Sequence, residues 1–301
     1  MIKPLVSICM ITYNHEKYIA QAIEGVLMQK TSFPFELVIG EDCSTDNTRS
    51  TCIEYQNRFP DIINIRLPVE NQGMIKNFIQ TMRACQGKYI GYCEGDDYWT
   101  DPCKLQKQVD FFESNPQYGL CFTDADILFR PSNKIIKSFD LSHKKYMPTG
   151  DVLEELIYIN PYKTCTAMFR SCAANGYNEI LDDNKFQFAD FGLWLHIAKN
   201  FKVGYLKEST AVYRVLKNSA SHFDSYEEFN SFIKSWGEVR SYFIKKYMLK
   251  VSKIKTLFFR LKISLAFIVK NKKFKSFFEY MLKIIYKKIA KLQSKILVSP
   301  R

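Results

Sequence analysis

Two common phosphate-binding patterns are missing from the 301-residue sequence. No G-x-G-x-x-G follows the first strand-like run, and no G-x-x-x-x-G-K-[ST] occurs anywhere. Such glycine-rich loops bring backbone N–H groups close to phosphate oxygens in dinucleotide-binding and P-loop proteins. Their absence argues against both classes. A nucleotide bound by this chain would therefore have to be held by carboxylates and a cation.

Cysteine pairs are missing as well. The nine cysteines include no C-x-x-C pair and form no cluster with the four histidines, so neither a zinc centre nor a disulfide framework is expected. Reduced thiols, as found in the cytosol, are expected instead. The chain runs from Met1 almost directly into an apolar segment, and no secretory signal is expected.

Positive charge is concentrated at one end of the chain. Residues 250–301 contain thirteen lysines, two arginines and one glutamate, which is +14 against a total of +12 and leaves −2 for residues 1–249. No RNA- or DNA-binding motif accompanies these lysines, so nucleic acid is not expected as a partner. The basic character therefore belongs to residues 250–301 and says nothing about the rest of the chain.

Short apolar runs alternate with helical patterns through the first hundred residues. Strands are predicted at residues 5–11, 35–40, 63–67 and 89–93, with helical spacing of apolar residues between them. This alternation predicts an α/β fold with a mostly parallel central sheet flanked by helices. In such sheets ligands bind outside the carboxyl ends of the strands.

A polar cluster follows three of the four predicted strands. The clusters are Thr12-Tyr13-Asn14, Glu41-Asp42, and Glu94, Asp96 and Asp97 in the segment EGDD. All three should meet at one edge of the sheet. Carboxylates packed this closely repel one another unless a positive partner lies between them. The sequence therefore raises the question of what that partner is.

The acid pair of EGDD suits a hard divalent cation. Mg²⁺ and Mn²⁺ take one or two carboxylates plus substrate phosphates, and the neighbouring carboxylate could accept hydrogen bonds from a ribose. Alternatively, the acids only favour the start of the helix expected near Asp101 and Pro102. The two other polar clusters at the same edge favour metal and nucleotide binding.

The three clusters, in this order and spacing, resemble the nucleotide-sugar domain of family 2 glycosyltransferases with the GT-A (Rossmann-like) fold. The likeness covers residues 4–115 and continues more weakly to about residue 222. It implies a nucleoside-diphosphate sugar as donor, a UDP-sugar before others, and inversion at the anomeric carbon. It also implies Mn²⁺ or Mg²⁺ as cofactor.

The resemblance assigns roles to single residues. Donor binding is implied for Thr12, Tyr13, Asn14, Glu41, Asp42, Asp96, Lys104 and Arg214, and metal binding for Asp97, Asp96 and His222. Glu41 and Glu94 stand where the family usually has Asp, which keeps the charge. Lys104 could instead be a solvated lysine on its helix, and His222 could be structural.

Asp190 is the candidate catalytic base. Displacement with inversion needs a carboxylate near the acceptor hydroxyl to take its proton. Asp190 resembles the second acid of the family's acidic pair before Leu-Trp, and Ala189 stands in place of the first. Alternatively, Asp190 is a helix N-cap, or Asp182 or Asp183 acts in its place.

Three regions are expected along the chain: a nucleotide-sugar-binding half (1–115), an acceptor-binding half (116–222) and a basic helical extension (223–301). Apolar stripes at residues 254–268 and 274–296, with lysines between them, favour binding to an anionic membrane surface. Packing of these stripes on the body is the alternative. The expected location is cytoplasmic, at the inner face of the cell membrane.

These features favour an inverting, metal-dependent glycosyltransferase that acts on a hydroxyl of a glycan or lipid-linked acceptor. Two alternatives stay open. A non-catalytic sugar-nucleotide-binding or scaffold protein would suit Ala189 and Leu216, where the family commonly has an acid and a histidine. A nucleotidyltransferase would usually show a glycine- and basic-rich loop after the first strand, which is absent here.

Overall fold

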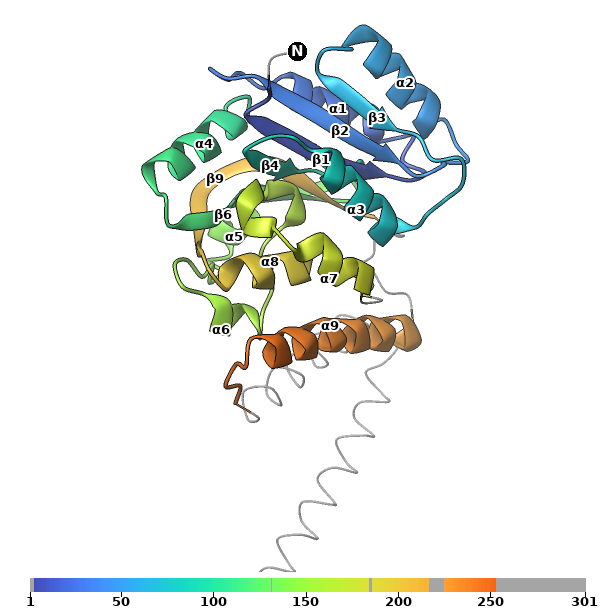
Figure 1. Ribbon diagram of the computed structural model, residues 1–301. Helices are drawn as coiled ribbons and strands as arrows, with labels where there is room; N and C mark the ends of the chain where they lie inside the picture. The colour runs from blue at the N-terminus through green and yellow to red at the C-terminus, as the bar shows by residue number, and fades with distance from the viewer. Residues whose placement is uncertain (1–2, 131, 184–185, 217–224, 253–301) are drawn as a thin grey trace, which may run out of the picture. The chain divides into compact units, whose positions relative to one another are not determined.

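The computed structural model describes residues 3–130, 132–183, 186–216 and 225–252. Residues up to 249 form one compact unit. Within the described residues a single mixed sheet has the strand order β3-β2-β1-β4-β8-β6-β9-β5, with β7 paired to β6 (Figure 1).

The strands are β1 (Val6–Thr12), β2 (Phe35–Glu41), β3 (Ile63–Arg66), β4 (Tyr89–Tyr92), β5 (Tyr98–Trp99), β6 (Tyr118–Phe129), β7 (Lys134–Ile136), β8 (Met168–Arg170) and β9 (Lys202–Val215). The longer helices are α1 (Ile19–Leu27), α2 (Thr48–Arg58), α3 (Met74–Ala84), α4 (Lys104–Ser114), α7 (Tyr177–Asp183), α8 (Asp190–Ala198) and α9 (Tyr226–Lys246). Short turns are α5 (Phe139–Ser142), α6 (Leu153–Leu156), η1 (Thr164–Thr166) and η2 (Ser171–Ala174).

The four predicted strands are present as β1 to β4, and they run parallel, with β1 between β2 and β4. Pairing continues past the strand ends, because Asp42 N donates to the Thr12 carbonyl at 3.1 Å and Gly95 N donates to the Ile11 carbonyl at 3.0 Å. The loops after β1, β2 and β4 therefore leave the sheet at the same edge. This confirms the predicted fold class and brings the three polar clusters together.

The second half of the sheet mixes strand directions. β8 runs antiparallel to β4 and β6, whereas β9 runs parallel to β6 and antiparallel to β5. The segment Thr164–Arg170 has the composition of a strand, but only Met168–Arg170 is one, because residues 164–166 form the 3₁₀ turn η1. The Thr166 hydroxyl stabilises this turn by donating to the Lys163 carbonyl at 2.8 Å.

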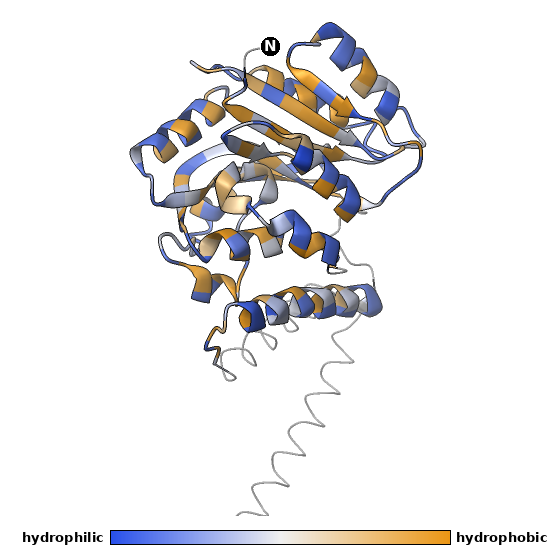
Figure 2. Cartoon of the chain, in the orientation of Figure 1, coloured by the Kyte–Doolittle hydropathy of each residue, from blue (hydrophilic) through white to orange (hydrophobic). Residues whose placement is uncertain are grey.

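Helices cover both faces of the sheet. On one face Ile19, Ile23 and Val26 of α1 join a core that also includes residues of α2 and α4, such as Tyr55 and Phe112. On the other face lie α3 and α8, whose Trp194 packs edge-on against Phe122 and Phe169. Figure 2 shows the central strands as mostly hydrophobic and the helices as amphipathic. Strands between two helical layers are buried on both faces, whereas each helix buries only one face.

Helix α9 packs on α8 through aromatic rings. Phe191 stacks on Trp236 with ring centroids 4.9 Å apart, and Phe188 meets Phe232 edge-on. A capping box of Ser225 and Glu228 fixes the start of the helix.

The expected boundaries at residues 115 and 222 stay predictions. The apolar stripes expected at 254–268 and 274–296 lie outside the described residues. No helix in the described part of the chain is long and apolar enough to cross a membrane.

Candidate active site

The loop after β1 is tied to the loop after β2. Asn14 N donates to Ser44 Oγ at 3.0 Å, and Asn14 Oδ1 accepts from Thr45 N at 2.8 Å. Asn14 and Cys43 both have left-handed backbones, with φ of 55° and 59°. Non-glycine residues in this region cost free energy and gather at functional sites. The two loops therefore form one shaped rim.

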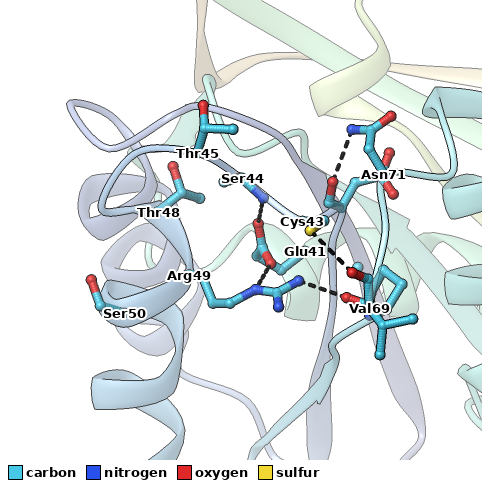
Figure 3. Close-up of polar contacts among 12 residues, drawn as sticks. Glu41, Cys43, Ser44, Thr45, Thr48, Arg49, Ser50, Val69 and Asn71 are labelled. Carbon is cyan, nitrogen blue, oxygen red and sulfur yellow. Dashed lines mark hydrogen bonds and ion pairs between the residues drawn. The ribbon is translucent and has the colours of Figure 1, made fainter.

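Glu41 supports this rim from inside. Its fully buried carboxylate accepts from Ser44 N at 2.7 Å and from Arg49 Nε at 2.5 Å, and Arg49 also donates to the Pro68 carbonyl at 2.8 Å. Figure 3 shows Arg49 between Glu41 and the loop after β3 that carries Val69. Glu41 thus shapes the loop, and Arg49, which no sequence motif indicated, neutralises its charge.

Asp42 holds the next loop of the rim. Its two carboxylate oxygens accept from Gln72 N at 2.8 Å and Gly73 N at 2.9 Å, while its carbonyl accepts from Asn71 at 2.9 Å. Tyr13 on the same rim is 42% exposed. The loop after β3 thus fixes the carboxylate of Asp42, whereas the ring of Tyr13 is open to solvent.

Of the acids of EGDD, Asp97 is buried and Glu94 and Asp96 are half-buried. Asp97 is 2% exposed, and its Oδ1 accepts from Arg214 N at 2.7 Å. Burial, and then repulsion from Asp96, raises the pKa of Asp97. Burial, followed by repulsion from Asp97, Asp96 and Asp190, raises the pKa of Glu94. Glu94 Oε2 is buried and has no hydrogen-bond partner among the residues that the structure describes.

Arg214 is the positive partner that the sequence left open. Pairing of β5 with β9 sets Tyr98 opposite Val212, which brings Arg214 beside EGDD. Its guanidinium donates to the Asp96 carbonyl and to Gln21, and it lies 4.4 Å from the centroid of the Tyr98 ring. A single arginine thus lies beside three carboxyl groups, two of which have raised pKa values.

His15 is a member of the site that sequence reasoning missed. Its Nδ1 lies 3.2 Å from Thr12 Oγ1, and its backbone N–H donates to Thr48 Oγ1 at 2.8 Å. Burial lowers the pKa of His15, whereas the charges of Asp96 and Asp46 act to raise it. The only signal in the sequence was its place directly after Asn14 in a polar loop.

Gly95 allows the first and third clusters to touch. A Cβ added there would lie 2.5 Å from Thr12 Oγ1 and 3.1 Å from His15 Nδ1. We predict that Gly95→Ala destabilises the fold by about 1–3 kcal/mol and lowers turnover at least about tenfold, because it displaces the rim. Urea unfolding and steady-state kinetics measure the two effects.

Gly91→Ala is the matched control on β4. Its added Cβ would meet the Trp99 ring at 3.4 Å, which is an ordinary contact. If Gly95→Ala has no larger effect than Gly91→Ala, then close packing at Gly95 does not shape the site.

Asp190 is the first residue of α8, and Ala189 holds the N-cap position without a side-chain bond. The Asp190 carboxylate accepts from Thr164 Oγ1 at 3.0 Å, and burial raises its pKa. The fallback acids are less suited, because Asp182 pairs with Arg83 at the surface and Asp183 is exposed.

Lys104 corrects an expectation. It was expected to reach a donor phosphate or to be solvated, but its side chain is fully buried. The ammonium donates to Gln108 and to the Thr166 carbonyl at 2.9 Å and lies 4.9 Å from the Trp99 ring. Burial lowers the pKa of Lys104 to about 8. The helical pattern alone did not indicate which face of α4 turns inward at this position.

We predict that Lys104→Ala destabilises the protein by about 2–4 kcal/mol, because it opens a cavity and removes the donor to the buried Gln108 Oε1. The Thr166 carbonyl keeps its bond from Gln108 Nε2 at 3.0 Å. Lys76→Ala, on the exposed face of α3, should change stability by less than about 0.5 kcal/mol. Chemical denaturation compares them. Unchanged stability together with a raised donor KM in Lys104→Ala would restore the phosphate role.

The structure does not test the expected role of His222 in metal binding. His222 lies outside the described residues. Within those residues, no group of three or more His, Cys, Asp or Glu side chains is arranged to hold a metal ion.

The sheet order and the acidic rim at its carboxyl edge define a GT-A fold. A family model described as Glycosyl transferase family 2 matches residues 7–173, more than half of the chain. The chain therefore belongs to glycosyl transferase family 2, and the resemblance seen in the three motifs is confirmed.

Two relatives illustrate the range of the family. Uncharacterized protein Rv1520 of Mycobacterium tuberculosis is 33% identical over 210 residues, covering 69% of this chain and 58% of the relative. The putative teichuronic acid biosynthesis glycosyltransferase TuaG of Bacillus subtilis is 27% identical over 221 residues, covering 73% and 82%. The chain thus spans less than two thirds of the mycobacterial relative.

Solved structures share the fold at low identity. TarS residues 1–349 of S. aureus in complex with UDP-GlcNAc aligns with a TM-score of 0.56 and 19% identity, covering 78% of this chain and 66% of that one. The mannosyltransferase PcManGT of Pyrobaculum calidifontis, in complex with GDP-Man and Mn²⁺, aligns with a TM-score of 0.53 and 15% identity, covering 98% and 89%.

Proposed function

We propose that the protein is an inverting, metal-dependent glycosyltransferase that moves a sugar from a nucleoside diphosphate to a hydroxyl group. The observation that supports this most is the gathering of Glu94, Asp96, Asp97 and Asp190 at one edge of the sheet. These acids come from two distant segments, and mutual repulsion contributes to the raised pKa of Glu94. Such an arrangement costs stability, which is typical of a functional site.

Asp190 is the residue that we propose takes the acceptor proton. Its carboxylate accepts the hydroxyl proton as the acceptor oxygen forms a bond to the anomeric carbon. The bond from that carbon to the diphosphate breaks on the opposite face, and the nucleoside diphosphate leaves with the electron pair. The configuration inverts because the displacement is single. The raised pKa of Asp190 makes its carboxylate a stronger proton acceptor.

The residues at the rim fit a divalent cation. Asp96 and Asp97 offer the one or two carboxylates that Mg²⁺ or Mn²⁺ takes when phosphates complete its shell. Glu94 Oε2 adds a buried oxygen without a hydrogen-bond partner among the described residues. When bound, such a cation supplies Lewis-acid neutralisation of the departing diphosphate. Arg214 contacts both aspartates, because its backbone N–H donates to Asp97 Oδ1 and its guanidinium donates to the Asp96 carbonyl.

The donor and the acceptor follow from similarity together with the site. TarS is solved in complex with UDP-GlcNAc and PcManGT with GDP-Man and Mn²⁺, which supports a nucleotide sugar. A UDP-sugar is proposed first, as the family resemblance implies. TuaG is named for teichuronic acid biosynthesis, which supports a glycan or lipid-linked acceptor. A position at the inner face of the membrane, through residues after 250, completes the proposal.

A donor screen tests the proposal. Thermal shift of the full chain with UDP-, GDP- and dTDP-sugars, with Mn²⁺ or with EDTA, should show stabilisation by one donor class in Mn²⁺ only, because binding to the native state raises stability. That donor should then release nucleoside diphosphate. Stabilisation without any release across an acceptor panel would favour a non-catalytic binder, and release of pyrophosphate would favour a nucleotidyltransferase.

A further inference from the structure

We propose that Thr164 is the positioning residue for the base Asp190 and replaces the acid that is missing at position 189. The proposal rests on the proposed function, in which Asp190 takes the acceptor proton. Ala189 has no group that could orient a neighbouring carboxylate. Thr164, 26 residues earlier in the chain, instead donates its hydroxyl to Asp190 Oδ2 at 3.0 Å.

The turn that carries Thr164 is fastened on both sides of this residue. Lys163 Nζ binds both oxygens of the buried Asp140 at 2.6 and 2.7 Å. The Cys165 carbonyl accepts from the indole N–H of Trp99 at 2.7 Å. A hydroxyl on such a turn can fix the plane of a carboxylate without strain.

The same turn connects the base to the metal motif. Trp99 follows directly after the E-G-D-D-Tyr segment, so its bond to the Cys165 carbonyl links η1 to the loop that holds Asp97. The buried Lys104 secures the far end of η1 through the Thr166 carbonyl. This assigns Lys104 a task at the site that does not involve the donor phosphate.

The Thr164 hydroxyl has a second effect on Asp190. A hydrogen bond donated to a carboxylate stabilises the charged form and lowers the pKa, opposing the effect of burial. Removing the hydroxyl should raise the pKa of Asp190. Because the base acts deprotonated, the acid limb of the pH–rate profile should then move to higher pH.

The experiment compares Thr164→Val, Thr164→Ala and Thr164→Ser in the full chain, with the donor found by the screen. Thr164→Val and Thr164→Ala should lower kcat about tenfold at neutral pH with an unchanged donor KM, and should move the acid limb up by about one pH unit. Thr164→Ser, which keeps the hydroxyl, should stay within about twofold of wild type.

Thr81→Val is the matched control. It also removes a buried threonine hydroxyl, which donates to the Asn77 carbonyl within α3, and it should leave the pH profile in place. If folded Thr164→Val or Thr164→Ala keeps the wild-type kcat and pH profile, the positioning role is overturned. If Asp190→Asn itself remains active, the proposed function fails, and these two failures are therefore distinguishable.

Discussion

Asp190→Asn is expected to lower turnover about a thousandfold, because the amide is isosteric but cannot take a proton. Donor and Mn²⁺ affinity should stay close to wild type, since only the transition state needs the lost acceptor. Steady-state kinetics with the donor identified by thermal shift, together with donor titration by calorimetry, gives both numbers.

Asp183→Asn is the matched control for this change. Asp183 is an exposed acid at the end of α7, and its amide variant should turn over like wild type. Loss of activity in Asp183→Asn with retention in Asp190→Asn would move the base to the preceding helix. A collapse of stability in Asp190→Asn would point to a structural role at the start of α8.

Asp97→Asn is expected to lower metal-dependent turnover by about a hundredfold to a thousandfold, because the side chain loses the charge that holds the cation. The amide oxygen can still accept from Arg214 N, so the fold around β5 and β9 should persist. Turnover measured against Mn²⁺ concentration should show no saturation in the range where wild type saturates.

The stability of Asp97→Asn should not fall with its turnover. Burial and Asp96 raise the pKa of Asp97 above its unfolded value. A carboxyl shifted this way costs stability once the pH passes its unfolded pKa of about 4, because the unfolded chain loses its proton more readily. Without metal at neutral pH, Asp97→Asn should therefore unfold at the same or a higher temperature. Asp110→Asn, on the exposed side of α4, should change neither property.

Much of the fold of the first hundred residues could be predicted from the sequence. Strands β1, β2 and β4 could be recognised by their continuous apolar runs, because strands buried on both faces are apolar throughout. Since these strands are parallel, the residues that follow them, Asn14, Asp42 and Asp97, lie at one edge of the sheet. Arg214 could be named only through the family resemblance, since its partners lie more than a hundred positions away. Pairing of β5 with β9, which no local pattern encodes, brings it to Asp96.

Where the structure differs from what the sequence pattern suggests, at Lys104 and at the segment from Thr164, the difference has a physical reason. Lys104 reads as a surface residue because lysine usually is one, and only the acceptors Gln108 and the Thr166 carbonyl make its burial possible. The segment from Thr164 reads as a strand by composition, but its hydroxyl groups favour a turn. The bond from Thr164 to Asp190 follows from that turn and from the start of α8, so it could not be read from spacing.

The anomeric configuration of the first product tests the central claim most directly. Proton NMR of the product, with an α-linked donor, reports the configuration at its anomeric carbon; when water is the acceptor, the spectrum of the fresh reaction is taken before mutarotation. A single displacement with Asp190 as base predicts that the β anomer forms first, and that Asp190→Asn forms it about a thousandfold more slowly. Initial formation of the α anomer by the wild-type protein would contradict the account.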